Sequence, residues 1–225
     1  MTQKGKALLL IGSAKMPHSN SESLGAYLIE RLTELGFEAE TIFIHRNLKS
    51  DEGTSSLLEA VDRADIIILA SPLYIDSLPY LVTKTLELIG EERHKKDRAI
   101  IQRLMCIINC GFPEARHTDT AIAICRKFAK ETGFKWAGGL GLGGGESLNE
   151  RPIKELGGMV RNIARSLDLT AEALSQGKDV PQEAIDIMAK PFIPNWLYLL
   201  FGGIGWKRRA KKHGAKKRLY DKPFE

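Results

Sequence analysis

The stretch ADIIILAS, residues 64–71, decides the fold of this 225-residue chain. Its consecutive apolar residues place hydrophobic side chains on both faces of a strand, which is typical of a parallel sheet covered by helices on both sides. KALLLIG, residues 6–12, has the same character. The two stretches predict buried neighbouring strands in an α/β protein.

Strand and helix patterns alternate on both sides of these stretches. SESLGAYLIERLTEL, residues 21–35, repeats apolar residues at helical spacing, and Gly36 is well placed to end that helix. Further strands are expected at 38–44, 104–110 and 135–142, and further helices at 57–64, 80–90, 118–132, 152–176 and 181–190. This alternation predicts a parallel sheet built from right-handed crossovers. Such sheets bind ligands beyond the carboxyl ends of their strands.

Length and composition limit the class of protein. We expect one domain with its own core at residues 1–176 and an extension at residues 177–225. No run of 18 apolar residues predicts a membrane-spanning helix, and the apolar start is too short for a signal peptide. The three cysteines contain no CxxC pair, which argues against a disulfide framework and a structural zinc site. These features favour a cytoplasmic protein.

Positive charge is concentrated near the end of the chain. The formal net charge is +5, but residues 207–218 hold eight Lys or Arg and no acidic residue. When this run and residues 219–225 are set aside, residues 1–206 carry a net charge of −2. The body is therefore slightly acidic, and the excess positive charge belongs to the tail.

The loop GSAKMPHSNSES, residues 12–23, joins the first strand to the first helix. Its Ser and Asn side chains offer hydrogen-bond donors at a helix start, where free N–H groups and the positive end of the dipole favour a phosphate. Lys15 adds a positive charge. The same residue types are common helix caps, so this loop alone fits phosphate binding and simple capping equally. It is neither a P-loop nor a GxGxxG dinucleotide motif.

The loop after the third strand carries a more specific pattern. SPLYIDSLPYLVTK, residues 71–84, contains two prolines that stiffen it and presents Tyr74. It resembles the Ser-Pro-x-Tyr segment, with a later Pro and Lys, of NAD(P)H-dependent FMN reductases and related flavodoxin-like oxidoreductases. The first loop resembles the G-S-x-R/K-x(3)-S-N-S/T phosphate loop of that family. The resemblance covers about residues 5–175; the alternative is that Tyr74 and the prolines only pack the loop.

The resemblance implies a flavodoxin-like three-layer sandwich that binds FMN. Its five-stranded parallel sheet has the order 2-1-3-4-5, with helices on both faces. The residues implied to hold the FMN phosphate are Ser13, Lys15, Ser19, Asn20 and Ser21. The residues implied to line the isoalloxazine ring are Pro72, Leu73, Tyr74, Ile75 and Asp76, with Asn109, Gly111 and Phe112 at its other edge.

The loops after the fourth and fifth strands add further candidates. Glu114 and His117 are candidates for contact with a nicotinamide donor. Cys110 is interpreted as a small buried strand-end residue in preference to a redox group. In GLGLGGGESLNE, residues 139–150, three consecutive glycines fit either a close approach to a ligand or lid, or a flexible connection.

By resemblance, we expect an NAD(P)H-dependent FMN oxidoreductase. Hydride passes from the nicotinamide to the flavin and then to a quinone, a flavin or another small acceptor. The cofactor carries this chemistry, so we assign no catalytic residue and no metal ligand. The resemblance also implies a homodimer. The alternative is a flavodoxin that exchanges single electrons with a protein partner, but flavodoxins are strongly acidic and this body is not.

The tail combines an apolar segment with the basic run. PFIPNWLYLLFGGIGW, residues 191–206, is aromatic but too short to span a bilayer. We favour packing on this subunit or a partner subunit. A second interpretation is contact of residues 191–218 with an anionic membrane, each charge contributing roughly 1 kcal/mol, which would place the protein at the inner face of that membrane. Nucleic acid fits least, because no recognisable reading module accompanies the charge.

Overall fold

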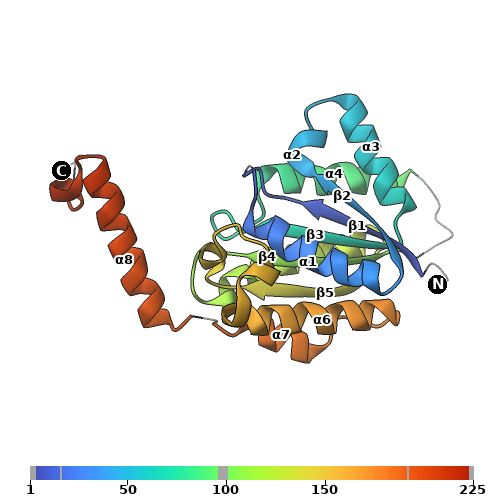
Figure 1. Ribbon diagram of the computed structural model, residues 1–225. Coiled ribbons are helices and arrows are strands. Elements are labelled where there is room, and N and C mark those ends of the chain that lie inside the picture. Colours follow the sequence, from blue (N-terminus) through green and yellow to red (C-terminus); the bar gives the residue numbers. More distant parts are fainter. Residues whose placement is uncertain (1–3, 16, 96–100, 192, 223–225) are drawn as a thin grey trace. The chain divides into compact units, whose positions relative to one another are not determined.

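The chain folds into two compact units, Met1–Phe192 and Ile193–Glu225. The computed structural model describes residues 4–15, 17–95, 101–191 and 193–222, so Phe192 of the expected apolar tail segment lies outside the described residues. The first unit contains the sheet and its covering helices (Figure 1). The second contains helix α8 (Asn195–Lys212) and a short 3-10 turn, η5 (Lys216–Arg218). The division expected at residue 176 stays a prediction.

Five parallel strands form one sheet in the order β2-β1-β3-β4-β5, which confirms the predicted flavodoxin-like topology. The strands are β1 (Gly5–Ile11), β2 (Phe37–Phe43), β3 (Ile66–Pro72), β4 (Arg103–Asn109) and β5 (Lys135–Leu142). From β1 the chain passes to β2 at one edge of the sheet and then returns to the other side of β1 as β3. The direction in which strands are added therefore reverses between β1 and β3. Asn109 at the end of β4 is in register with both Pro72 and Leu142. The carboxyl ends of the strands therefore meet at one edge.

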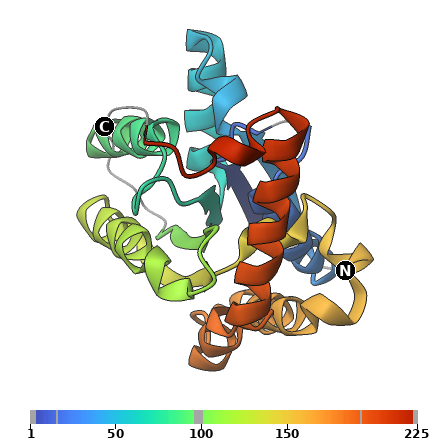
Figure 2. The ribbon, with the colours of Figure 1, turned by 90° about the vertical axis from the view of Figure 1, so that its left-hand side faces the viewer.

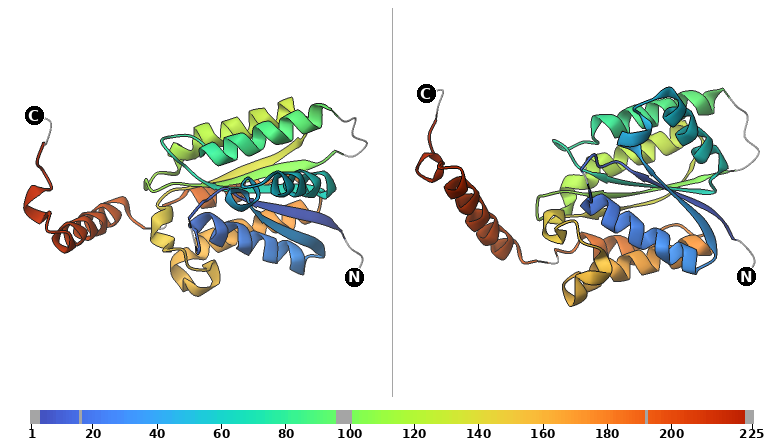
Figure 3. Two further views of the ribbon diagram at one scale, coloured as in Figure 1. Left: turned by 90° about the horizontal axis from the view of Figure 1, so that it is seen from above. Right: turned by 45° about the horizontal axis from the view of Figure 1, so that its top comes forward.

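Helices cover both faces of the sheet, as the view from above makes visible (Figure 3). One face carries α1 (Asn20–Glu34), α6 (Arg161–Ser175) and α7 (Gln182–Ala189). The other carries α2 (Ile44–Asn47), α3 (Asp51–Arg63), α4 (Tyr80–His94) and α5 (Asp119–Glu131).

Alternate residues of the inner strands enter opposite cores. Ile66 and Ile68 of β3 belong to the core beneath α1 and α6, whereas Ile67 and Leu69 belong to the core beneath α3 and α4. Successive side chains of a strand point to opposite faces. This is the physical reason why ADIIILAS is apolar without interruption.

Helix boundaries differ from the expected ones where polar residues or glycine intervene. Helix α3 begins after Ser50, whose hydroxyl accepts a hydrogen bond from the backbone of Gly53, and so starts six residues before the expected helix. The helix expected at 152–176 begins only at Arg161, behind two 3-10 turns. Gly157, the first residue of the second turn, has a φ of +59°, and this left-handed residue interrupts a continuous helix.

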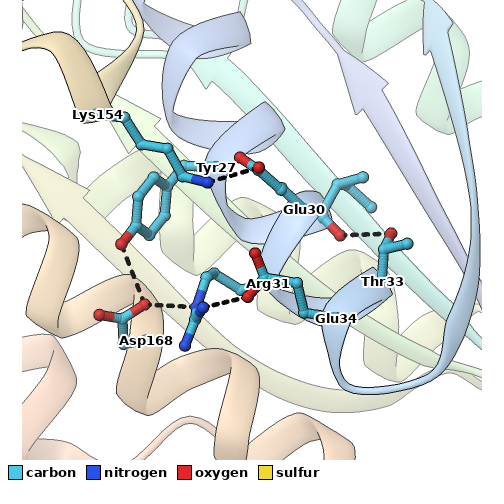
Figure 4. Close-up of polar contacts among 8 residues, drawn as sticks. Tyr27, Glu30, Arg31, Thr33, Glu34, Lys154 and Asp168 are labelled. Atoms are coloured by element: carbon cyan, nitrogen blue, oxygen red, sulfur yellow. Dashed lines mark hydrogen bonds and ion pairs between the residues drawn. The ribbon is translucent and has the colours of Figure 1, made fainter.

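A polar cluster fixes α1 against the segments that cover it (Figure 4). The hydroxyl of Tyr27 donates to Asp168 of α6 at 3.2 Å, and Arg31 Nε lies 2.9 Å from the same carboxylate. Lys154 pairs with Glu30 at 2.5 Å. Burial, followed by the Asp168 charge, raises the pKa of Tyr27. The phenol therefore stays protonated and keeps donating at neutral pH.

Replacing Asp168 with Asn should lower the free energy of unfolding by roughly 1 kcal/mol, because α1 loses its charged acceptor on α6. Urea denaturation measures the change. The matched control is Glu34→Gln, since Glu34 pairs with Arg31 within the same helix and does not link two helices. An equal or larger loss in the control would show that the link between α1 and α6 contributes nothing of its own.

Candidate functional site

The loops after β1, β3, β4 and β5 gather at the carboxyl edge of the sheet, which faces the viewer in Figure 2. Backbone hydrogen bonds continue between these loops beyond the strands. Gly12 donates to the carbonyl of Ala70 at 2.8 Å, and Leu73 donates to Asn109 at 2.8 Å. The loops are therefore held side by side.

Three buried serines bring hydrogen-bond donors to the start of α1. Ser13 Oγ accepts from the backbone N–H of Lys15 at 3.2 Å, and Ser19 Oγ accepts from that of Glu22 at 3.1 Å. Ser21 Oγ accepts from a side chain of β4 at 2.8 Å. In the part of the chain that the structure describes, none of these three hydroxyls donates a hydrogen bond. The hydrogen atom of each hydroxyl is therefore available to an acceptor of a bound ligand.

These donors fit the phosphate of FMN. The first backbone N–H groups of a helix have no acceptor within it, so those at the start of α1 add to the three hydroxyls. A phosphate accepts several hydrogen bonds and is favoured at the positive end of the helix dipole. Binding of the FMN phosphate by this loop stays a prediction.

Lys15 and Asn20 are brought to the same place, but both engage Glu150. The backbone N–H of Glu150 donates to Asn20 Oδ1 at 2.8 Å, and the ammonium of Lys15 pairs with the Glu150 carboxylate. His45, just after β2, also joins the loop, with Nδ1 3.2 Å from the carbonyl of Ser13. Neither Glu150 nor His45 is among the expected site residues. The only signal for His45 is its position directly after a strand.

The loop after β3 contains a strained tight turn. Tyr74 and Ser77 exchange backbone hydrogen bonds of 2.9 and 3.1 Å around Ile75 and Asp76. Ile75 and Asp76 have φ values of +48° and +58°, a region that β-branched residues such as Ile avoid. The turn leaves Ile75 99% and Tyr74 54% exposed. Pro72 and Leu73, which lead into the turn, are half-buried.

The loop after β4 presents a second exposed ring. Phe112 is 53% exposed, and its ring centroid lies 4.5 Å from that of His117 at an interplanar angle of 31°. Gly111 beside it is exposed, and Glu114 lies 3.8 Å from His117 Nε2. Because β3 and β4 are neighbours, Tyr74 and Phe112 come from adjacent loops at the same edge.

Asn109 connects these loops from beneath. Its buried side-chain amide donates to Ser21 Oγ at 2.8 Å and to the carbonyl of Ser71 at 3.2 Å. One side chain of β4 thus joins the start of α1 to the end of β3. Contact of Asn109 with a flavin ring stays a prediction.

The consecutive glycines after β5 pack against the loop after β4. A Cβ on Gly143 would lie 2.2 Å from the carbonyl oxygen of Pro113, so only glycine fits there. Gly144 donates to the Phe112 carbonyl at 2.6 Å, and Gly145 donates to that of Cys110 at 2.8 Å. The close approach is therefore to backbone of this chain.

Cys110 is only 4% exposed. Burial raises the pKa of its thiol, so the neutral thiol predominates at ordinary pH. Only the thiolate is strongly nucleophilic. This environment agrees with the structural role expected for Cys110.

Comparison with known families shows the family to which the chain belongs. A sequence model of the NADPH-dependent FMN reductases matches residues 6–136, more than half of the chain. The chain belongs to the NADPH-dependent FMN reductase family. It is thus a flavin oxidoreductase that uses FMN with NAD(P)H as electron donor. The match includes the loops after β1, β3 and β4.

Solved structures share the fold at low sequence identity. The NADH:FMN oxidoreductase EMOB is 14% identical, with a TM-score of 0.56 over 84% of this chain and 96% of that one. NAD(P)H:quinone oxidoreductase from Methanothermobacter marburgensis is 17% identical, with a TM-score of 0.53 over 76% of this chain and 98% of that one. Rubredoxin oxygen:oxidoreductase from Desulfovibrio gigas is 14% identical, with a TM-score of 0.56 over 76% of this chain and 35% of that one. No curated protein sequence matches the chain.

Replacing Asn109 with Ala should lower the free energy of unfolding by about 2 kcal/mol, because two buried acceptors lose their donor. FMN affinity should fall as well, since the loops lose their common anchor. Urea denaturation and flavin fluorescence titration measure the two effects.

Asn47→Ala is the matched control, because the Asn47 side chain also donates to a carbonyl, that of Gly53, but between α2 and α3. It should lower stability without changing FMN affinity. Unchanged FMN affinity in Asn109→Ala would contradict the anchoring role of Asn109.

Proposed function

We propose that the protein passes electrons from NAD(P)H through FMN bound at this edge to a quinone, a flavin or another small acceptor. The observation that carries the proposal is the set of three buried serine hydroxyls, each of which accepts a protein N–H and retains its own hydrogen. Together with the start of α1, they suit the phosphate that distinguishes FMN from riboflavin.

The exposed rings support the placement of the flavin ring system. Tyr74 and Phe112 present aromatic surface from neighbouring loops, and Ile75 adds an exposed apolar side chain. Exposed apolar side chains that gather beside polar groups commonly mark a binding site. The backbone strain at Ile75 and Asp76 points the same way, because strained residues concentrate at functional sites.

The residues of this chain bind and orient, and the cofactor supplies the redox chemistry. When bound, FMN would supply the redox chemistry, taking up a hydride from NAD(P)H and passing its electrons to an acceptor. The serine hydroxyls donate to the phosphate, and the turn at Tyr74–Ser77 bounds the ring. The exposed apolar side chains at this edge would let the planar electron donor, and then the electron acceptor, reach the flavin. The proposed working unit is a homodimer.

We expect the purified protein to show the visible absorption bands of flavin, with FMN added if it is lost in purification. These bands should bleach within seconds of anaerobic NADPH addition, because hydride transfer reduces the flavin. Stopped-flow absorbance measures the rate.

Two other results would contradict the proposal in different ways. Bands that persist with NADPH and NADH but bleach with dithionite would favour a flavodoxin-type electron carrier. No binding of added FMN would remove the proposed site itself.

A second candidate function concerns α8, considered by itself. Its first part is apolar and aromatic, and Trp196, Leu199 and Trp206 are exposed within their unit. Basic residues begin at Lys207, so the two characters are separated along the helix axis. Twelve residues from Asn195 to Trp206 span about 18 Å, against a hydrocarbon core of about 30 Å. No helix among the described residues has the length and apolar content that crossing a bilayer requires.

These features support a flavoprotein whose tail contacts an anionic membrane surface. Full-length protein should float with vesicles that contain anionic lipid, and deletion of residues 193–225 should abolish flotation. Neutral vesicles are the control, because the basic run requires negative charge. Failure of the full-length protein to float, or a loss of dimer on deletion, would instead favour packing of the tail on a partner subunit.

A further inference from the structure

Glu150 binds the proposed phosphate loop at two points. Its carboxylate pairs with the ammonium of Lys15, and its backbone N–H donates to Asn20 Oδ1 at 2.8 Å. Lys15 is the only lysine or arginine of the loop GSAKMPHSNSES. The Glu150 carboxylate therefore already pairs with Lys15, the cation that the family resemblance implies for the FMN phosphate.

The backbone around Glu150 is held in an unfavourable conformation. Asn149 and Glu150 have φ values of +50° and +61°. Asn tolerates this left-handed region, but Glu does not favour it. The two contacts to the loop offset this cost and hold the acidic side chain at the phosphate loop.

We propose that Glu150 acts as an internal competitor of the FMN phosphate for Lys15 and so weakens FMN binding. This inference rests on the proposed phosphate site. A phosphate near neutral pH carries nearly two negative charges, so it must either displace the Glu150 carboxylate from Lys15 or bind beside it. Both routes lower the affinity for FMN. Riboflavin, which has no phosphate, escapes the competition.

The surroundings reinforce the effect. Glu22 lies in the first turn of α1, and its carboxylate is 3.6 Å from His18 Nδ1, so a second acidic side chain lies near the loop. A pocket of about 280 Å³ between α1 and residues 150–154 is lined by His18, Glu22 and Glu150, among others. This space gives the Glu150 side chain room to leave Lys15 when a phosphate arrives.

The test compares FMN and riboflavin affinities of oxidised protein by flavin fluorescence titration at low ionic strength. Glu150→Gln removes the charge and keeps the backbone N–H that binds Asn20. Glu150→Gly also removes the side chain and tolerates the positive φ, so the two variants affect backbone strain differently. Both should bind FMN more tightly, by up to about fivefold, which is the upper end of the range expected for one exposed ion pair. Neither should change riboflavin affinity.

Two controls separate the possible results. Glu155→Gln removes an acid from the neighbouring 3-10 turn, where Glu155 lies 3.9 Å from Arg151, and should leave FMN affinity unchanged. Ser13→Ala removes one proposed phosphate donor and should weaken FMN but not riboflavin.

Unchanged or weaker FMN binding in both Glu150 variants, with the Ser13→Ala loss intact, would overturn the competition and leave the phosphate site standing. Weaker binding would mean that Glu150 orients Lys15 for the phosphate. Equal tightening of riboflavin would also overturn the proposal. No selective loss in Ser13→Ala would instead remove the phosphate site on which the inference rests.

Discussion

The side-chain amide of Asn109 is the interaction on which the ligand edge depends. Backbone hydrogen bonds such as that from Gly12 to Ala70 continue between the loops once the strands end, and side-chain contacts are a second source of their relative positions. Asn109 supplies such contacts, because it is buried and its amide donates to both Ser21 Oγ and the Ser71 carbonyl. A buried donor with two acceptors has few other ways to be satisfied, which favours a single arrangement. The start of α1 and the end of β3 are thereby positioned from one residue of β4.

Around Asn109, backbone contacts hold the loops of this edge together, and exposed apolar side chains project from them. Gly143 allows the loop after β5 to lie directly on the backbone at Pro113, and the Tyr74–Ser77 turn is closed by two backbone hydrogen bonds. The same turn holds Ile75 in a strained and fully exposed position. Strain and exposure both cost free energy, and neither improves the core. They are understandable where a bound ring system covers the exposed side chains.

The sequence predicts what depends on local pattern and misses what depends on distant contact. The buried strands β1, β3 and β4 follow from apolar runs, and the glycine-containing β5 begins and ends at the expected residues 135 and 142. The serines after β1 follow from residue type at a helix start, and the structure supplies the N–H groups that donate to them. Glu150 carries no such signal, because its partners lie 135 and 130 residues away. The early start of α3 is missed because its first turn is polar and only the Ser50 cap marks it.

Charge alone does not explain how this edge would select the phosphate that we propose for it. The body carries a net charge of −2, and the one lysine of the phosphate loop is already paired with Glu150. Long-range attraction for an anion is therefore small. Hydroxyl and backbone N–H donors act only at contact distance, and the helix dipole adds the equivalent of about half a charge that fades within the first turn. Recognition must then depend on several neutral donors being aimed at one point before the ligand arrives. Asn109 and the cap of α1 maintain this geometry, and for that reason buried hydrogen bonds, more than surface charge, determine what the edge can hold.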